Sequence, residues 1–163
     1  MIEAVVFDLD GTLVRLPIDY ESLFEEFRRI MRVADVRPLV DTISRMDGRT
    51  RELVFGAWEK AELAVLGKVV ANDKGMKVYG EFAGKRRALV TLQGKVVVEA
   101  VLRRFEFAFD VVVTREDALF RAAQLSKAVN QLGVDVRNVL FVGNTEGDAV
   151  AAEKVGCQFF RVM

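Results

Sequence analysis

The sequence contains no histidine and only one cysteine, Cys157, among its 163 residues. The absence of histidine excludes Ser-His-Asp and Cys-His triads, His-ligated zinc or haem, and a histidine general base. A single cysteine excludes an internal disulfide and a Cys-x-x-Cys motif. Any chemistry must therefore come from carboxylates, hydroxyls, amides, lysine, arginine and a hard metal ion.

The sequence also lacks a net charge, because 24 Lys and Arg residues balance 24 Asp and Glu residues. A neutral balance gives no electrostatic reason to expect a nucleic acid or an anionic membrane as partner. No apolar stretch is long enough to span a membrane, and the opening apolar run is too short for a signal peptide because Asp8 and Asp10 interrupt it. We therefore expect a cytoplasmic protein whose oligomeric state is left open by the sequence.

Five short apolar runs predict strands that are buried on both faces, as in a parallel sheet. They are Ala4–Phe7, Ala88–Val90, Val111–Val113, Val139–Val142 and Phe159–Val162. Helical periodicity separates the last four runs, over residues 95–105, 117–132 and 146–155, with Asp117 as the expected cap of the second of these helices. This alternation predicts an α/β fold with right-handed crossovers and an open sheet.

The segment 16–84 interrupts the alternation of strands and helices. It shows no convincing strand, and apolar residues recur in it at helical spacing, as at Leu23, Phe27 and Ile30. We interpret it as an all-helical insertion after the first strand. The predicted organisation is a core made of residues 1–15 and 85–163 and a helical cap made of residues 16–84.

The most informative stretch is Asp8-Leu9-Asp10-Gly11-Thr12-Leu13, which follows the first predicted strand. Ligands bind at the carboxyl ends of strands in open α/β sheets. Two carboxylates at this position, followed by a glycine turn, make a site for a hard cation. One of the two carboxylates can then attack phosphorus, and the other can protonate the leaving oxygen and later activate water.

This stretch resembles the first motif of the haloacid dehalogenase superfamily, most of whose members are phosphatases. The resemblance implies a Rossmann-like, three-layer core with a helical cap, Asp8 as nucleophile and Asp10 as general acid/base. It also implies Mg²⁺ bound by the Asp8 carboxylate and the Asp10 main-chain carbonyl. Dehalogenating members lack the second aspartate, so Asp10 points to phosphoryl transfer.

Two further segments resemble later motifs of the superfamily. Thr91, at the end of the second predicted strand, matches the phosphate-binding hydroxyl of the second motif. Gly143-Asn144-Thr145-Glu146-Gly147-Asp148 resembles the fourth motif, in which two acids complete the metal site. Asp148 falls at the second acidic position, but Asn144 replaces the first acid. An amide carbonyl ligates Mg²⁺ without supplying charge, so weaker metal affinity is expected.

The third motif departs most from the superfamily pattern. The superfamily places a Lys, usually followed by Pro, before the helix that leads to the fourth strand, where it steadies charge between nucleophile and phosphate. Ungapped counting puts this position at Leu119, which carries no charge. Arg121 is the nearest cation and is the candidate for this role. In the cap, Arg45, Arg49 and Arg51 are candidates for holding a carboxylate or a second phosphate, although a solvated cluster is the simpler interpretation.

The sequence therefore predicts a Mg²⁺-dependent phosphatase that forms an aspartyl-phosphate on a small phosphorylated metabolite, similar to phosphoglycolate phosphatases. A phosphomutase shares the first step. A weakened or inactive relative that binds phosphate or a protein partner is the alternative that Asn144 and the missing motif lysine favour. A receiver-type signalling domain also combines clustered acids, Thr and Lys, but the Asp-x-Asp-Gly-Thr motif and the helical insertion argue against it.

Overall fold

The computed structural model describes residues 1–163 and contains a five-stranded sheet in which every pair of neighbouring strands is parallel. The strand order is β5 (Val111–Val113), β4 (Arg86–Val90), β1 (Ala4–Phe7), β6 (Val139–Gly143) and β7 (Gln158–Arg161). The predicted α/β class is confirmed, and each predicted apolar run forms a strand. β1 lies at the centre of the sheet, so its carboxyl end is surrounded by neighbouring strands.

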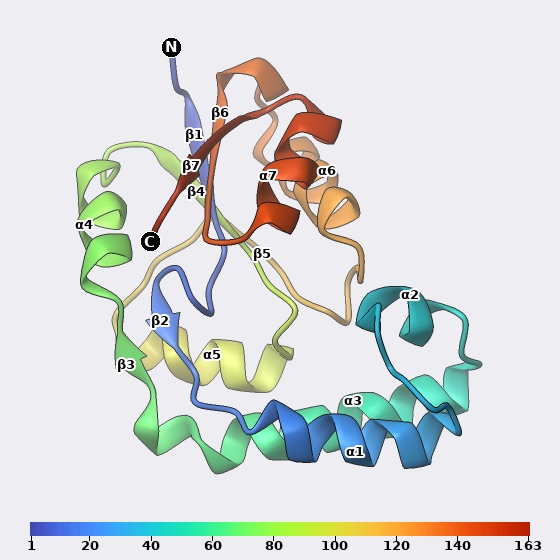
Figure 1. Ribbon diagram of the computed structural model, residues 1–163. Helices are drawn as coiled ribbons and strands as arrows, with labels where there is room; N and C mark the ends of the chain where they lie inside the picture. Colours follow the sequence, from blue (N-terminus) through green and yellow to red (C-terminus); the bar gives the residue numbers. More distant parts are fainter.

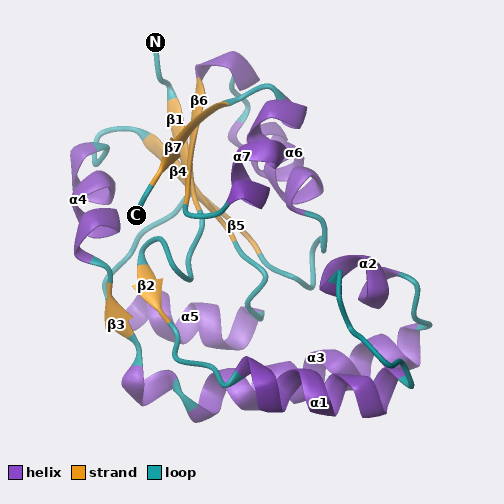
Figure 2. Ribbon diagram, in the orientation of Figure 1, coloured by secondary structure: helices purple, strands orange, loops and turns teal.

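Two layers of helices cover the sheet (Figure 2). Alternate residues of β1 face opposite sides: Val5 and Phe7 pack with α4 (Asp73–Glu81) and α5 (Lys95–Arg104), whereas Ala4 and Val6 pack with α6 (Arg121–Leu132) and α7 (Glu146–Val155). The continuous apolar run of β1 is explained by this burial on both faces. No helix of the protein is both long enough and apolar enough to cross a membrane.

A separate group of helices lies beyond the carboxyl ends of the strands (Figure 1). It consists of α1 (Tyr20–Met31), α2 (Leu39–Ser44) and α3 (Gly48–Ala64), followed by a short 3₁₀ helix, Leu66–Lys68. These helices share a hydrophobic cluster of their own, in which Phe27 packs edge-to-face on Trp58. We call residues 16–71 the helical segment. We propose that the predicted cap ends there, because Val78 of α4 belongs to the cluster on the sheet.

The segment between β1 and β4 is not purely helical, in contrast to the expectation from sequence. β2 (Val14–Arg15) and β3 (Val70–Ala71) form a two-residue antiparallel ribbon where the chain enters and leaves the helical segment. Two residues are too few to show the alternation by which a strand is recognised in a sequence.

The start of α6 also differs from the expectation. Asp117 does not cap this helix: its carboxylate accepts hydrogen bonds from the main-chain N–H and the hydroxyl of Thr114 in the preceding turn. The helix begins four residues later at Arg121, and the short 3₁₀ helix Val136–Asn138 leads from it into β6. Asp and Thr bond readily to nearby backbone, so an Asp before a helical pattern marks a turn as well as a cap.

Gly75 of α4 provides a test of how the acidic loop after β1 is held. A Cβ atom at Gly75 would lie 1.7 Å from the main-chain oxygen of Thr12, whereas a Cβ atom at Gly80 in the same helix meets nothing within 4 Å. We expect Gly75→Ala to lower the free energy of unfolding by about 3 kcal/mol, as overpacking against backbone does. Gly80→Ala should raise it by roughly 0.5–1 kcal/mol because alanine favours the helix.

Urea denaturation of the two variants measures both effects. Equal stabilities of Gly75→Ala and Gly80→Ala would contradict the close approach of α4 to the loop.

Candidate active site

A cavity of about 320 Å³ lies between the carboxyl ends of the strands and the helical segment. Its lining combines residues from both parts of the molecule: Asp8, Asp10, Gly11, Tyr20, Leu39, Trp58, Leu92, Gln93, Arg121, Asn144 and Thr145. Four of the predicted site residues therefore share one cavity: Asp8, Asp10, Arg121 and Asn144. They come from three loops that meet at the edge of the sheet because the strands are parallel.

Asp8 lies at the bottom of this site and is 4 % exposed. Its main-chain N–H donates to the carbonyl of Val142, which ties the acidic loop to the neighbouring strand β6. The chain then turns at Gly11, whose φ of +83° favours glycine. A Cβ atom at Gly11 would lie 2.3 Å from the side-chain amide of Asn144, so the glycine also lets the two loops approach closely.

Arg121 connects the two most buried carboxylates of the site. Its Nη2 donates to Oδ1 of Asp8 at 3.0 Å, and its Nε donates to Oδ1 of Asp148 at 2.9 Å. Its Nη1 donates to the amide oxygen of Gln124, one turn further along α6, at 2.8 Å. Three acceptors therefore fix the guanidinium, in the planar geometry for which arginine is suited. Because α6 begins at Arg121, this side chain can extend from the helix end to the loop after β1.

Burial dominates the electrostatics of both aspartates of the first motif. Burial raises the pKa of Asp8 to about 7, against the lowering effect of Arg121 and with a further increase caused by Asp148. The pKa of Asp10 is also raised by burial, partly offset by the main-chain N–H of Leu16, which donates to Asp10 Oδ1 at 2.9 Å. A carboxyl group with a raised pKa is suited to donating a proton near neutral pH.

The structure does not bring the Thr91 hydroxyl into the cavity. Thr91 is fully buried, and its Oγ accepts from the main-chain N–H of Gln93 while donating to the side-chain oxygen of the same residue. Gln93, two residues further along the chain, lines the cavity instead. Contact of Thr91 with a phosphate would require this local pairing to open.

The fourth-motif residues divide into two environments. The Asp148 carboxylate accepts three hydrogen bonds: Oδ2 accepts from the main-chain N–H groups of Asn144 and Thr145, and Oδ1 accepts from Arg121. Thr145 Oγ in turn accepts from the Asp148 N–H, which completes a capping box at the start of α7. We propose that Asp148 holds Arg121 and the turn, and that it does not bind a metal ion directly.

The remaining oxygen atoms form a donor set that suits a hard cation. The Thr12 hydroxyl lies 3.2 Å from Asp8 Oδ2 and 3.3 Å from Asn144 Oδ1, so these two oxygens converge on one point. No group of three or more acidic, His or Cys side chains is placed to hold a metal. The donor set for Mg²⁺ would then be one carboxylate, one amide and the main-chain carbonyl of Asp10, which are ligand types that Mg²⁺ accepts, with little charge.

The low charge of this donor set leads to a prediction about Asn144. Asn144→Asp places a second carboxylate at the convergence point, and we expect Mg²⁺ to bind about tenfold more tightly. Titration calorimetry with Mg²⁺ alone measures this, with Asn130→Asp on α6 as a matched control that adds the same charge elsewhere. Unchanged affinity of Asn144→Asp would show that position 144 does not contact the ion.

Several residues of the site were not identified from the sequence. Thr12 and Gln124 position Asp8 and Arg121, and Tyr20 and Trp58 line the cavity from the helical segment. The spacing of Arg121 and Gln124, three residues apart on one helix, is a signal that could have indicated their contact. Trp58 has two roles, because it also belongs to the hydrophobic cluster of α1–α3.

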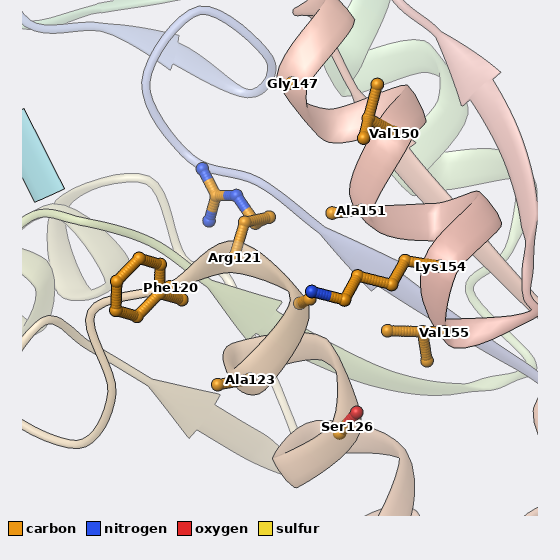
Figure 3. A pocket seen from close by; sticks show the side chains of 10 residues that line it. Phe120, Arg121, Ala123, Ser126, Gly147, Val150, Ala151, Lys154 and Val155 are labelled. Atoms are coloured by element: carbon orange, nitrogen blue, oxygen red, sulfur yellow. The ribbon is translucent and has the colours of Figure 1, made fainter. Parts of the chain in front are cut away.

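A larger cavity than this one lies elsewhere in the molecule. It measures about 610 Å³, lies between α6 and α7, and contains no acidic residue in its lining. Figure 3 shows the Arg121 guanidinium at its edge, pointing away from Ser126 and Lys154 towards the segment that follows β1. The volume of a cavity therefore does not identify the candidate site here, because the larger cavity lacks the acidic residues Asp8 and Asp10.

Comparison with known proteins gives results that agree with this geometry. The sequence model of the haloacid dehalogenase-like hydrolase family matches residues 82–162, which run from the end of α4 through β7. No curated protein matches the sequence.

Solved structures share the fold over nearly the whole chain. A protein assigned as a haloacid dehalogenase-like hydrolase from Bacteroides fragilis has a TM-score of 0.76 and 18% identity, and the match covers 100% of this chain and 88% of that one. A haloacid dehalogenase-like family protein from Streptococcus pneumoniae has a TM-score of 0.72 and 17% identity over 99% and 85% of the two chains. CbbY from Rhodobacter sphaeroides, solved in complex with phosphate, has a TM-score of 0.67 and 20% identity over 98% and 85%. The family model makes residues 82–162 similar to the haloacid dehalogenase-like hydrolases, and the solved structures share the fold of the whole chain.

Proposed function

We propose that the protein is a phosphatase that hydrolyses a small phosphomonoester through an aspartyl-phosphate on Asp8. The observation that carries the proposal is the position of the Arg121 guanidinium, which donates to Asp8 at 3.0 Å at the side of a cavity that also contains Asp10. A nucleophile, an adjacent acid and a fixed cation are the groups that phosphoryl transfer requires.

In the first step, a carboxylate oxygen of Asp8 attacks phosphorus, and the bond between phosphorus and the ester oxygen breaks. The Asp10 carboxyl group gives its proton to the departing oxygen, so that the alcohol leaves in neutral form. Arg121 holds the Asp8 side chain in place and offsets negative charge as the phosphoryl group approaches.

In the second step, Asp10, now a carboxylate, takes a proton from water, and the resulting hydroxide oxygen bonds to phosphorus. The bond between phosphorus and the Asp8 oxygen breaks, which releases inorganic phosphate and restores both carboxyl groups. Mg²⁺, when bound by Asp8, Asn144 and the Asp10 carbonyl, supplies neutralisation of charge on the phosphoryl oxygens.

Structural relatives support this proposal at the level of the fold. CbbY from Rhodobacter sphaeroides was solved with phosphate, and a mutant of the same protein was solved with xylulose-1,5-bisphosphate. Both ligands carry the group that the proposed reaction transfers. A phosphomutase would share the aspartyl-phosphate, but would return the phosphoryl group to a sugar hydroxyl and not to water.

Trapping of the intermediate tests the proposal directly. The protein is mixed with p-nitrophenyl phosphate and Mg²⁺ and quenched with borohydride, which reduces an acyl phosphate at aspartate to homoserine. We expect homoserine at position 8 in the peptide mass spectrum, together with release of phosphate. Hydrolysis without modification of position 8 would reject Asp8 as the nucleophile.

Phosphate binding without turnover is a second candidate function, and it follows from the low negative charge of the proposed metal ligands. With Asn144 in place of an acid, the protein would bind phosphate without efficient turnover. In that case, titration calorimetry would detect phosphate binding that depends on Arg121, while the borohydride experiment would yield no homoserine.

A further inference from the structure

We infer that the site selects phosphomonoesters whose leaving group is small and uncharged, and that it disfavours substrates with a carboxylate or a second phosphate. The inference rests on the proposed function and names its substrate class. It differs from the expectation of a phosphoglycolate-like substrate, whose leaving group carries a carboxylate. The argument depends on charge, polarity and volume in the cavity between the helical segment and the sheet.

The cavity contains one cation, Arg121, and that cation already contacts the carboxylates of Asp8 and Asp148. Opposite these groups, the helical segment contributes only Tyr20, Leu39 and Trp58. None of the three carries a positive charge. A second anionic group on the substrate would therefore be desolvated without a counter-ion and would lie near carboxylates, which is unfavourable.

The other arginines near the helical segment are not available to this cavity. Arg115 is 2 % exposed, is paired with Glu62 at 2.7 Å and does not line it. Arg51 lines a separate cavity of about 290 Å³ between α3 and the loop before α6. Arg45 and Arg49 are exposed and line neither cavity. The arginines that the sequence offered for a second phosphate therefore lie outside the substrate space.

The polar groups that remain are neutral hydrogen-bonding groups. Trp58 Nε1 is buried and has no hydrogen-bond partner in the protein. The pKa of Tyr20 is raised by burial and by the nearby carboxylates of Asp10 and Glu62, so its hydroxyl stays protonated and able to donate. The Tyr20 hydroxyl suits the hydroxyl or carbonyl oxygens of a polyol or an aldehyde.

The volume of the cavity limits the size of the leaving group. A value of about 320 Å³ falls near the lower end of the range of small-molecule sites, roughly 300–1,000 Å³. The phosphoryl group must occupy the part next to Asp8. The remaining space suits a leaving group of a few carbon atoms.

A pair of substrates of equal chain length tests the charge rule. Glycerol 3-phosphate and 3-phosphoglycerate share a three-carbon skeleton and differ in that the first has a hydroxymethyl group where the second has a carboxylate. We expect kcat/KM for glycerol 3-phosphate to exceed that for 3-phosphoglycerate by at least about tenfold, the effect of one unpaired charge at ~1.4 kcal/mol. Equal values, or a preference for 3-phosphoglycerate, would overturn the inference and leave the phosphatase function intact.

A charge variant provides a second, independent measurement. Leu39→Lys introduces a cation on the side of the cavity opposite Asp8, and we expect it to raise the relative kcat/KM for 3-phosphoglycerate about tenfold. Leu53→Lys is the matched control, because Leu53 is 57% exposed on α3 and does not line the cavity. An equal change in both variants would count against the inference. If the wild-type protein hydrolyses neither substrate nor p-nitrophenyl phosphate, the proposed function itself fails, and the inference fails with it.

Discussion

Replacement of Asp8 by Asn is expected to reduce phosphatase activity to background and to make the metal-free protein more stable. The loss of activity, about 10³-fold or more, follows because an amide nitrogen or oxygen does not replace the attacking carboxylate. Activity with p-nitrophenyl phosphate and Mg²⁺ measures the first effect. Asp41→Asn, in an exposed position of α2, is the matched control and should retain wild-type activity.

The stability effect follows from the raised pKa of Asp8. Its carboxyl group has a pKa of about 7 in the folded protein against 3.8 for the free side chain. At about pH 3 and below the group is mostly protonated both in the folded protein and in the unfolded chain, and little penalty arises. As the pH rises towards 7, the unfolded chain loses the proton more readily, so the wild-type protein loses stability relative to a neutral side chain at this position.

Thermal unfolding in EDTA at pH 5 and pH 8 measures this dependence. We expect Asp8→Asn to raise Tm on the order of 5 °C at pH 8, and by less at pH 5. A Tm that falls equally at both pH values would show that the ion pair with Arg121 outweighs the cost of burying the carboxylate.

Removal of Glu62 is expected to have the largest effect on folding. Glu62 of α3 and Arg115 are both almost fully buried, and their atoms Oε2 and Nη1 lie 2.7 Å apart. Glu62 also accepts from the N–H of Gly94, and Arg115 also donates to the carbonyls of Leu92 and Phe55. Glu62→Leu leaves the Arg115 charge buried without a partner, and we expect a loss of about 3–5 kcal/mol in the free energy of unfolding.

A double variant that removes both charges distinguishes the net contribution of the ion pair from the cost of leaving one charge buried alone. Burial raises the pKa of Glu62 even though Arg115 opposes the increase, which indicates that desolvation offsets most of the attraction. Glu62→Leu combined with Arg115→Met should therefore recover most of the lost stability. Guanidinium chloride unfolding of the two single variants and the double variant measures the coupling. A double variant as unstable as the sum of the single ones would show that no such coupling exists.

The sequence predicted the sheet and the position of its acidic loop because both leave local signals. Strands buried on both faces appear as short apolar runs, and Asp8 and Asp10 follow the first of them directly. Helix ends with a local cap were also predictable, since Asp19 accepts from the N–H of Ser22 at the start of α1. Arg121 could be proposed from its nearness to the expected lysine position.

Other features depend on contacts between distant parts of the chain. Asn72, next to α4, donates to the carbonyl of Thr12, which lies 60 residues earlier in the sequence. Likewise, Tyr20 and Trp58 reach the cavity only because α1 and α3 pack across the ends of the strands. No periodicity or motif in the sequence specifies such pairs. The start of α6 was misplaced because Asp117 has the local pattern of a cap but forms a turn with Thr114.

The ribbon of β2 and β3 brings the two ends of the helical segment together. Arg15 pairs with Val70, so the chain departs towards the helices and comes back at almost the same point. Segments with adjacent ends can be exchanged for shorter or longer ones at small cost in loop-closure entropy. A two-residue hairpin turn is sufficient to join such strands. The topology of the sheet and its acidic loop therefore does not depend on which helices are inserted between β2 and β3. A different insertion at this ribbon would leave Asp8 and Asp10 in place and would change the residues that line the opposite side of the cavity.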